Sequence, residues 1–199
     1  MKNTQTWIRK NRSTLVLFVF FVILLVSPDT KAWLMRQMIS TGIFNSTIKE
    51  SPVSTEKGSA AISFEVADEK GTVINTAQLK GKVIFINFWA SWCPPCRAEF
   101  PSIQKFYEKY KTHPDMVFLT VNLDDNPELG KVYLTDNQFT IPFMTPVQNI
   151  PGEYYSGSLP TTVVLDKQGK IRMQHSGMAD YSKESFYKQI DQLLKEQHH

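Results

Sequence analysis

Two cysteines, Cys93 and Cys96, separated by two prolines, are the only thiols in the chain. Two thiols cannot build the multi-disulfide framework of a small secreted domain, and they supply only half of a four-thiolate zinc site. A Cys-x-x-Cys pair that follows a buried strand and opens a helix is instead typical of a redox-active dithiol. The sequence therefore predicts a redox-active disulfide between Cys93 and Cys96, with no metal and no other cofactor at the site.

The position of each cysteine on the expected helix suggests its role. Cys93 should lie at the helix N-terminus, where the helix dipole and free N–H groups stabilise a thiolate, so we expect it to be the nucleophile. Cys96 follows one turn later and should be the less exposed resolving thiol. A structural disulfide is the alternative, although closing a two-residue loop contributes little chain entropy.

The intervening residues, Pro94 and Pro95, indicate the direction of electron flow. Neither has an N–H group, so the Cys93 thiolate loses two potential donors and keeps chiefly the N–H of Cys96. A less stabilised thiolate makes the disulfide less oxidising, because the power of an oxidant comes from a stabilised reduced form. We therefore predict a reductant.

Hydrophobic patterning predicts the strands that must position this pair. Nearly continuous apolar runs at 83–89 and 116–121 are typical of strands that are covered on both faces. Further short strands, including two hairpins, are expected at 61–66, 72–74, 143–147, 161–165 and 170–174.

Three helices are expected between and after these strands. Apolar residues three and four positions apart predict one at 94–111, and the Asn-Pro-Glu sequence at 126–128 predicts the start of a second, which should run to about Phe139. A third should begin at about Ser182. The alternation of strand and helix implies an α/β sandwich with helices on both faces of a mixed sheet.

The first 35 residues are expected to direct export. Basic residues precede twelve uninterrupted apolar residues at 15–26, a length typical of a cleavable signal peptide. The sequence at 30–32 is a poor cleavage site, however, and apolar residues resume at 32–35, so we predict an uncleaved membrane anchor. The basic flank predicts that the domain faces the periplasm or the cell exterior, where disulfides persist.

The chain after residue 31 carries almost no net charge, and residues 36–60 show no sustained hydrophobic periodicity. Residues 1–31 carry five basic residues and one acid, whereas the remainder has 17 basic and 18 acidic residues. Because phosphate binding needs concentrated positive charge, nucleic acid is excluded as a partner. Residues 36–60 mix polar and scattered apolar residues, and we interpret them as a tether.

The residues around the cysteines resemble a known family. The segment 87–101 (NFWASWCPPCRAEFP), together with Leu-Pro-Thr-Thr at 159–162 and the turn at 166–170, is similar to the membrane-anchored, thioredoxin-like thiol-disulfide oxidoreductases of the TlpA/ResA group. The resemblance covers about 61–199 and implies a thioredoxin-like α/β fold there: a mixed central sheet flanked by helices, with an N-terminal hairpin and a central insert. It also implies reductase activity outside the cytosol, often in cytochrome c maturation.

The same resemblance suggests roles for residues outside the cysteine motif. Pro160 matches the cis-proline that faces the cysteines in this family, which leaves the backbone of Leu159 free to pair with an extended substrate segment. Glu99 lies one helical turn after Cys96, where a carboxylate can accept the Cys96 proton, and the family carries a glutamate there. A solvated helix glutamate is the alternative. Asn87 replaces the buried aspartate of thioredoxins, which leaves proton handling to Glu99.

Five residues are expected to contact a substrate: Trp92, Pro94, Pro95, Leu159 and Pro160. For Trp92, packing is the alternative to docking, since its ring is amphipathic. Tyr154 and Tyr155 are further candidates for a partner groove, with a structural role as the alternative. Peroxide reduction is not expected, because Ala90 stands where peroxiredoxins carry a threonine or serine.

A reductant outside the cytosol must be regenerated, and nothing in this chain carries electrons across a bilayer. We therefore expect a membrane electron-donating thiol-disulfide transporter as a partner, besides protein disulfide substrates. The alternatives are a disulfide oxidase or isomerase, a copper-delivery or redox-sensing module that uses the thiols with a distant His175, and a binding domain with an incidental disulfide.

Overall fold

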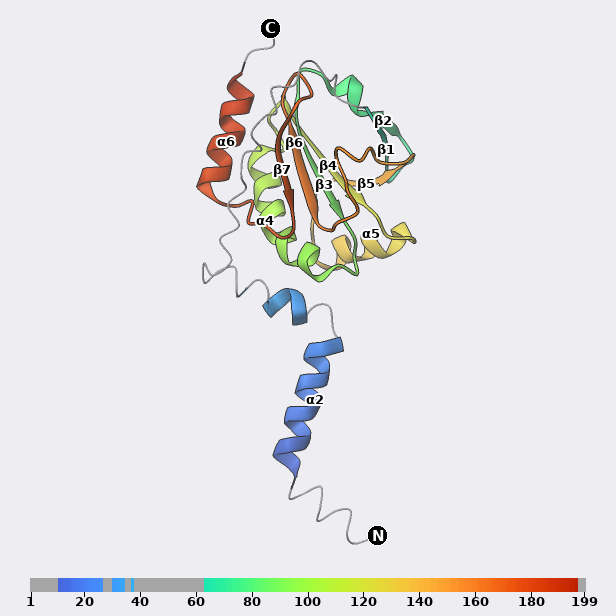
Figure 1. The fold of residues 1–199 in the computed structure, drawn as a ribbon, viewed down its shortest axis with the longest axis vertical. Helices are drawn as coiled ribbons and strands as arrows, with labels where there is room; N and C mark the ends of the chain where they lie inside the picture. The colour runs from blue at the N-terminus through green and yellow to red at the C-terminus, as the bar shows by residue number, and fades with distance from the viewer. Residues whose placement is uncertain (1–10, 27–29, 35–36, 38–62, 197–199) are drawn as a thin grey trace.

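Seven strands form one mixed sheet in the computed structural model, which describes residues 11–26, 30–34, 37 and 63–196. In chain order the strands are β1 (Glu65–Asp68), β2 (Val73–Asn75), β3 (Val83–Trp89), β4 (Met116–Asn122), β5 (Phe143–Pro146), β6 (Thr161–Leu165) and β7 (Ile171–Ser176). Across the sheet their order is β2-β1-β5-β4-β3-β6-β7 (Figure 1). The predicted α/β class with a mixed central sheet is confirmed.

Strand β3 lies in the interior of the sheet, and the cysteine motif follows its C-terminal end. It pairs in parallel with β4 and antiparallel with β6, and all seven of its residues are buried. Burial on both faces explains its continuous apolar sequence. The two expected hairpins are present as antiparallel pairs, β1 with β2 and β6 with β7.

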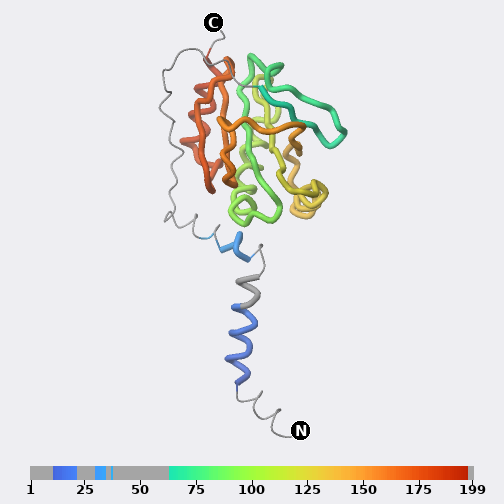
Figure 2. Tube along the Cα trace, turned by 45° about the vertical axis from the view of Figure 1, so that its right-hand side comes forward, coloured from blue at the N-terminus to red at the C-terminus, as the bar shows by residue number. Residues whose placement is uncertain are grey.

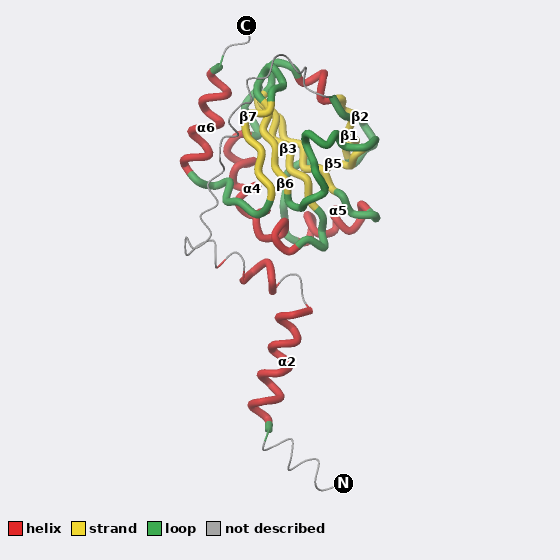
Figure 3. Tube along the Cα trace, viewed as in Figure 1, coloured by secondary structure: helices red, strands yellow, loops and turns green. Residues whose placement is uncertain are grey.

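Three helices pack against one face of this sheet (Figure 3): α4 (Pro94–Tyr110), α5 (Pro127–Asp136) and α6 (Glu184–Lys195). Most of their buried residues belong to one apolar cluster with Phe85 and Phe118 of the sheet. Within it, the ring of Phe106 on α4 lies 4.9 Å from that of Phe186 on α6 and 5.2 Å from that of Phe85. These aromatic contacts fix α4, and with it the cysteine motif, against the sheet.

The expectation of helices on both faces holds only in part, because α4, α5 and α6 all lie on one face and the other carries, in the described part of the chain, only a short 3-10 helix. A second apolar cluster lies on the other face of the sheet. Besides strand residues it contains Phe64, Leu79 of the short 3-10 helix η1 (Thr76–Leu79), and residues of the 147–160 segment, which crosses the sheet in Figure 2. The steps from β3 to β4 and from β4 to β5 are both parallel and run the same way along the sheet. Right-handed crossovers therefore place α4 and α5 on the same side.

Element boundaries differ from prediction by a few residues. Helix α5 ends at Asp136 rather than near Phe139, because Gln138 adopts a positive φ of 58° and turns the chain back. The ring of Phe139 then packs 5.5 Å from that of Phe100. Helix α6 begins at Glu184, two residues after the predicted start.

The N-terminal predictions fall partly outside the described residues. Helix α2 (Arg12–Val26) contains the apolar run. Among the described residues, no helix combines the length and apolar character required to span a bilayer. The tether expected at 36–60 lies, apart from Gln37, outside the described residues.

Candidate active site

Cys93 and Cys96 form a disulfide at the junction of β3 and α4, with 5.3 Å between their Cα atoms. Strand β3 ends at Trp89, a short turn follows, and Cys93 is the N-cap of α4. The first two helical positions are the prolines 94 and 95. The N–H of Cys96 donates to the Sγ of Cys93 over 3.2 Å, which is the single donor that the proline argument anticipated.

The two sulfurs differ in their access to a partner. A cavity of about 310 Å³ is lined by Trp92, Cys93, Pro94, Pro95, Leu123, Tyr155, Gly157 and Leu159. Cys93 is 3 % exposed and borders this cavity, whereas Cys96 is fully buried and does not. A visiting disulfide therefore reaches Cys93 first.

The walls of the cavity are mostly apolar. Trp92 is 62 % exposed, so its ring is available at the surface instead of packing in the core. Tyr155 lines the cavity, whereas Tyr154 is buried within the second apolar cluster, on the sheet face opposite to α4. Such walls can accept an extended apolar segment of a substrate protein beside the reactive sulfur.

The Leu159–Pro160 peptide bond is cis, as the resemblance implied. Leu159 lines the cavity together with the motif, but Pro160 is buried and is not among the lining residues. The carbonyl of Pro160 accepts a hydrogen bond from the N–H of Gly177 over 2.8 Å. Of this pair, Leu159 is thus the residue that a substrate can contact.

Glu99 is buried, with 1 % of its surface exposed, so the alternative of a solvated helix glutamate is wrong. Its Oε1 accepts a hydrogen bond from Asn87 Nδ2 over 2.9 Å, and its Oε2 accepts one from the N–H of Ala179 over 3.2 Å. Burial raises the pKa of Glu99 to about 8, although both hydrogen bonds act to lower it. The carboxyl group can therefore hold or release a proton close to neutral pH.

Two polar residues, Thr162 and Tyr181, extend this network, and sequence reasoning assigned neither of them a role, although Thr162 belongs to the matching segment 159–162. Thr162 Oγ1 accepts hydrogen bonds from Asn87 Nδ2 over 2.9 Å and from the hydroxyl of Tyr181 over 2.6 Å.

Leu123, which lines the cavity, was not predicted from the sequence. Its signal was its position directly after β4, because the ends of neighbouring parallel strands lie at the same edge of a sheet.

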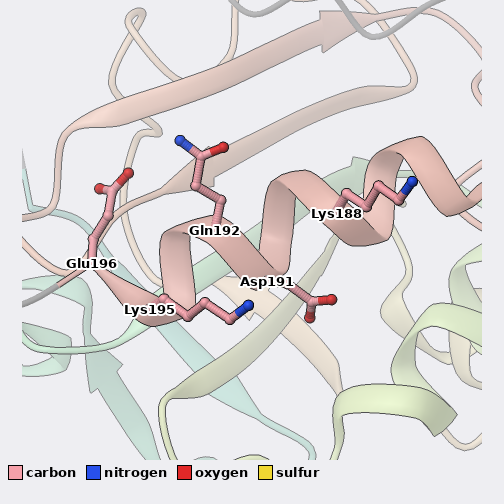
Figure 4. A pocket seen from close by; sticks show the side chains of 5 residues that line it. All are labelled: Lys188, Asp191, Gln192, Lys195 and Glu196. Carbon is pink, nitrogen blue, oxygen red and sulfur yellow. The ribbon is translucent and has the colours of Figure 1, made fainter.

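A second hollow, of about 450 Å³, lies on α6 and the residue that follows it (Figure 4). It is lined by Lys188, Asp191, Gln192, Lys195 and Glu196. The two acids already have partners, since Asp191 accepts a hydrogen bond from Tyr110 and Glu196 pairs with Arg172. This hollow does not include the cysteines, and we assign it no part in the thiol chemistry.

Comparisons with known proteins agree with this geometry. The Redoxin family model matches residues 56–190. The thiol-disulfide oxidoreductase ResA of Bacillus anthracis is 36 % identical over 123 residues, which cover 60 % of this chain and 69 % of the relative. The ResA protein of Halalkalibacterium halodurans is 32 % identical over 137 residues, covering 67 % and 76 %.

Solved structures extend the comparison to the fold. A Chlorobium tepidum protein assigned as a thiol:disulfide interchange protein DsbE superposes with a TM-score of 0.59 at 29 % identity, covering 70 % of this chain and 98 % of that protein. StoA from Bacillus subtilis superposes with a TM-score of 0.53 at 25 % identity, covering 69 % and 100 %.

Proposed function

The chain belongs to the Redoxin family and is a thiol-disulfide oxidoreductase of the ResA and DsbE kind with a thioredoxin-like fold, and from this premise we propose that it reduces protein disulfides through Cys93 and Cys96. One observation carries the assignment of roles: Cys93 borders the apolar cavity at the N-terminus of α4, and Cys96 lies buried behind it.

The proposed cycle moves two electrons from the cysteine pair to the substrate. The Cys93 thiolate attacks one sulfur of the substrate disulfide, and the other substrate sulfur leaves as a thiolate. Cys96 then loses its proton and attacks the Sγ of Cys93. This step releases the second substrate sulfur as a thiolate and re-forms the Cys93–Cys96 disulfide. The two substrate thiolates take up protons to become thiols.

Glu99 is the proposed acceptor of the Cys96 proton. It lies one turn further along α4 than Cys96, and it is buried as Cys96 is. Its raised pKa, about 8, is close to the ordinary range of a thiol, which favours proton transfer between the two groups. Asn87, at the position where thioredoxins carry an aspartate, orients the carboxyl group and cannot itself titrate.

The direction of reaction is proposed from the donors around Cys93. Among the described residues, the N–H of Cys96 is the only group shown donating a hydrogen bond to the Sγ of Cys93. The two prolines between the cysteines have no N–H group to donate. We expect the reduction potential of the full chain, equilibrated in thiol-disulfide buffers, to lie closer to about −270 mV than to about −120 mV. A reduction potential of about −120 mV would support a disulfide oxidase instead.

The setting of the reaction is also a proposal. Residues 1–35 would anchor the chain in the cell membrane, and 36–60 would carry the domain into the periplasm or the cell exterior. Substrates would be protein disulfides, with cytochrome c maturation as one context, and a membrane thiol-disulfide transporter would return electrons to the pair. Membrane fractionation of cells expressing the chain, with and without residues 1–35, tests the anchor.

A further inference from the structure

Ser91, in the turn that joins β3 to α4, is held from two sides. Its N–H donates to both carboxylate oxygens of Asp124, each over 3.1 Å, and its hydroxyl donates to Oδ1 over 3.1 Å. On the other side, the guanidinium of Arg97 donates to the Ser91 carbonyl over 3.4 Å. We call this arrangement the Ser91 clamp. It grips the residue that directly precedes Trp92 and Cys93.

The Asp124 side of the clamp comes from the chain just after β4. Asp124 is 7 % exposed, and its Oδ2 also accepts a hydrogen bond from Asn122 Nδ2 over 2.8 Å. The N–H of Asp124 donates in return to Asn122 Oδ1 over 3.2 Å. Burying a carboxylate is costly unless donors satisfy it, and two of the donors here belong to Ser91. The Asp124 carboxylate is therefore satisfied largely by Ser91, in the turn between β3 and α4.

Helix α5 supports both sides of the clamp. A Cβ atom at Gly130 would overlap Asn122 Nδ2 and lie 2.8 Å from Asn122 Cγ, so the helix backbone lies directly against the residue that orients Asp124. The guanidinium of Arg97 lies 4.5 Å from the centre of the Tyr133 ring, and the Tyr133 hydroxyl donates to the Arg97 carbonyl over 3.3 Å.

We propose that Asp124 is a positioning residue for disulfide exchange, which acts through Ser91 to hold the Trp92–Cys93 turn at the cavity. Exchange requires the attacking sulfur to be aligned with the substrate disulfide, and misplacement of a reacting group by about 1 Å can cost about a hundredfold in rate. Within the turn, the Cys93 N–H donates to the Ala90 carbonyl over 3.2 Å, and the clamp adds the longer-range contacts. This inference rests on the proposed function, since it takes Cys93 as the nucleophile.

The test compares the reduced full chain with three variants, Asp124→Asn, Ser91→Ala and Asp125→Asn. Asp125 is the matched control, because it is the neighbouring acid but is exposed. Each protein is assayed with insulin, a protein disulfide that the proposed function places beside Trp92, and with Ellman's reagent, a small disulfide that needs no docking surface. Thermal unfolding of each variant gives its folded fraction at the assay temperature.

We expect Asp124→Asn to lower the rate constant with insulin by about tenfold or more, and to affect Ellman's reagent much less. Ser91→Ala, which removes one hydrogen bond, should cost about two- to tenfold with insulin. Asp125→Asn should stay within about twofold of the wild type for both substrates.

The clamp is overturned if Asp124→Asn and Ser91→Ala match the control, or if both substrates lose rate equally in proportion to the unfolded fraction. Should Asp124→Asn fail to fold, Ser91→Ala decides the question alone. If the wild type reduces neither disulfide, the proposed function fails and the clamp fails with it. If the wild type and Asp125→Asn reduce insulin and Asp124→Asn does so equally well, only the clamp fails.

Discussion

The buried Glu99 carboxyl group should make the stability of the fold depend on pH. Burial raises its pKa from 4.5 to about 8, so the folded chain keeps a proton that the unfolded chain releases above about pH 4.5. Between these two values the folded state binds more protons than the unfolded state. The free energy of unfolding should therefore fall as pH rises through this window and level off above it.

Replacing Glu99 by glutamine should remove this contribution to the pH dependence. We expect the wild-type free energy of unfolding to fall by about 4 kcal/mol between pH 4.5 and 8 through this group, and Glu99→Gln to lack that decrease. Urea unfolding of the oxidised chain across this range measures it. Glu108→Gln is the control, because Glu108 is exposed on the same helix and Lys111 lowers its pKa. An equal slope in Glu99→Gln and the wild type contradicts the assignment.

The same substitution should alter catalysis. An amide cannot take the Cys96 proton, so we expect Glu99→Gln to slow insulin reduction by about a hundredfold and to remove the titration near pH 8 from its rate profile. Steady-state rates from pH 6 to 9.5, with circular dichroism to confirm folding, check this result. An unchanged profile in a folded variant would falsify the proton-acceptor role.

Local sequence signals predicted the elements that carry the cysteines better than the insert. The continuous apolar run marked β3, and the prolines marked the first turn of α4. The start of α5 was also predicted, and its N-cap is confirmed by the hydrogen bond from the Glu128 N–H to Asn126 Oδ1 over 3.2 Å. Its end was not, because no local pattern marked the positive φ of Gln138, after which Phe139 packs against Phe100 of another helix.

Gly130 tests how closely α5 is tied to the rest of the domain. In an isolated helix, alanine would stabilise this position by about 1 kcal/mol relative to glycine. Here its Cβ would collide with Asn122 and lie 2.9 Å from Phe143 Cε2, so we expect Gly130→Ala to destabilise the chain by about 1 to 3 kcal/mol. Urea unfolding gives the sign directly.

The control for this change is Gly152→Ala, where an added Cβ would meet no atom within 4 Å. It should shift the free energy of unfolding by less than about 0.5 kcal/mol. A stabilised Gly130→Ala would show that α5 does not press on Asn122, and it would weaken the support proposed for the clamp.

At the scale of the whole molecule, the sequence predicted the chemistry and the fold class but only part of the site. Cys93, Cys96 and Leu159 were identified because motif and resemblance mark them. Asp124 was not predicted, because the residue that it contacts, Ser91, lies 33 residues earlier in the chain. Tyr155 was a candidate from the sequence, whereas Gly157 reaches the cavity through a segment without regular periodicity, so the shape of the cavity depends on tertiary packing rather than on local pattern.

The central claim is that Cys93 attacks the substrate disulfide and Cys96 resolves the mixed disulfide, and a trapping experiment tests this claim most directly. Full-length Cys96→Ser and Cys93→Ser chains are reduced, mixed with insulin and analysed on non-reducing gels and by mass spectrometry. The account predicts that Cys96→Ser accumulates a mixed disulfide through Cys93, which no second thiol can resolve, and that Cys93→Ser accumulates little. Accumulation through Cys96 in the Cys93→Ser chain, with none in Cys96→Ser, would contradict it.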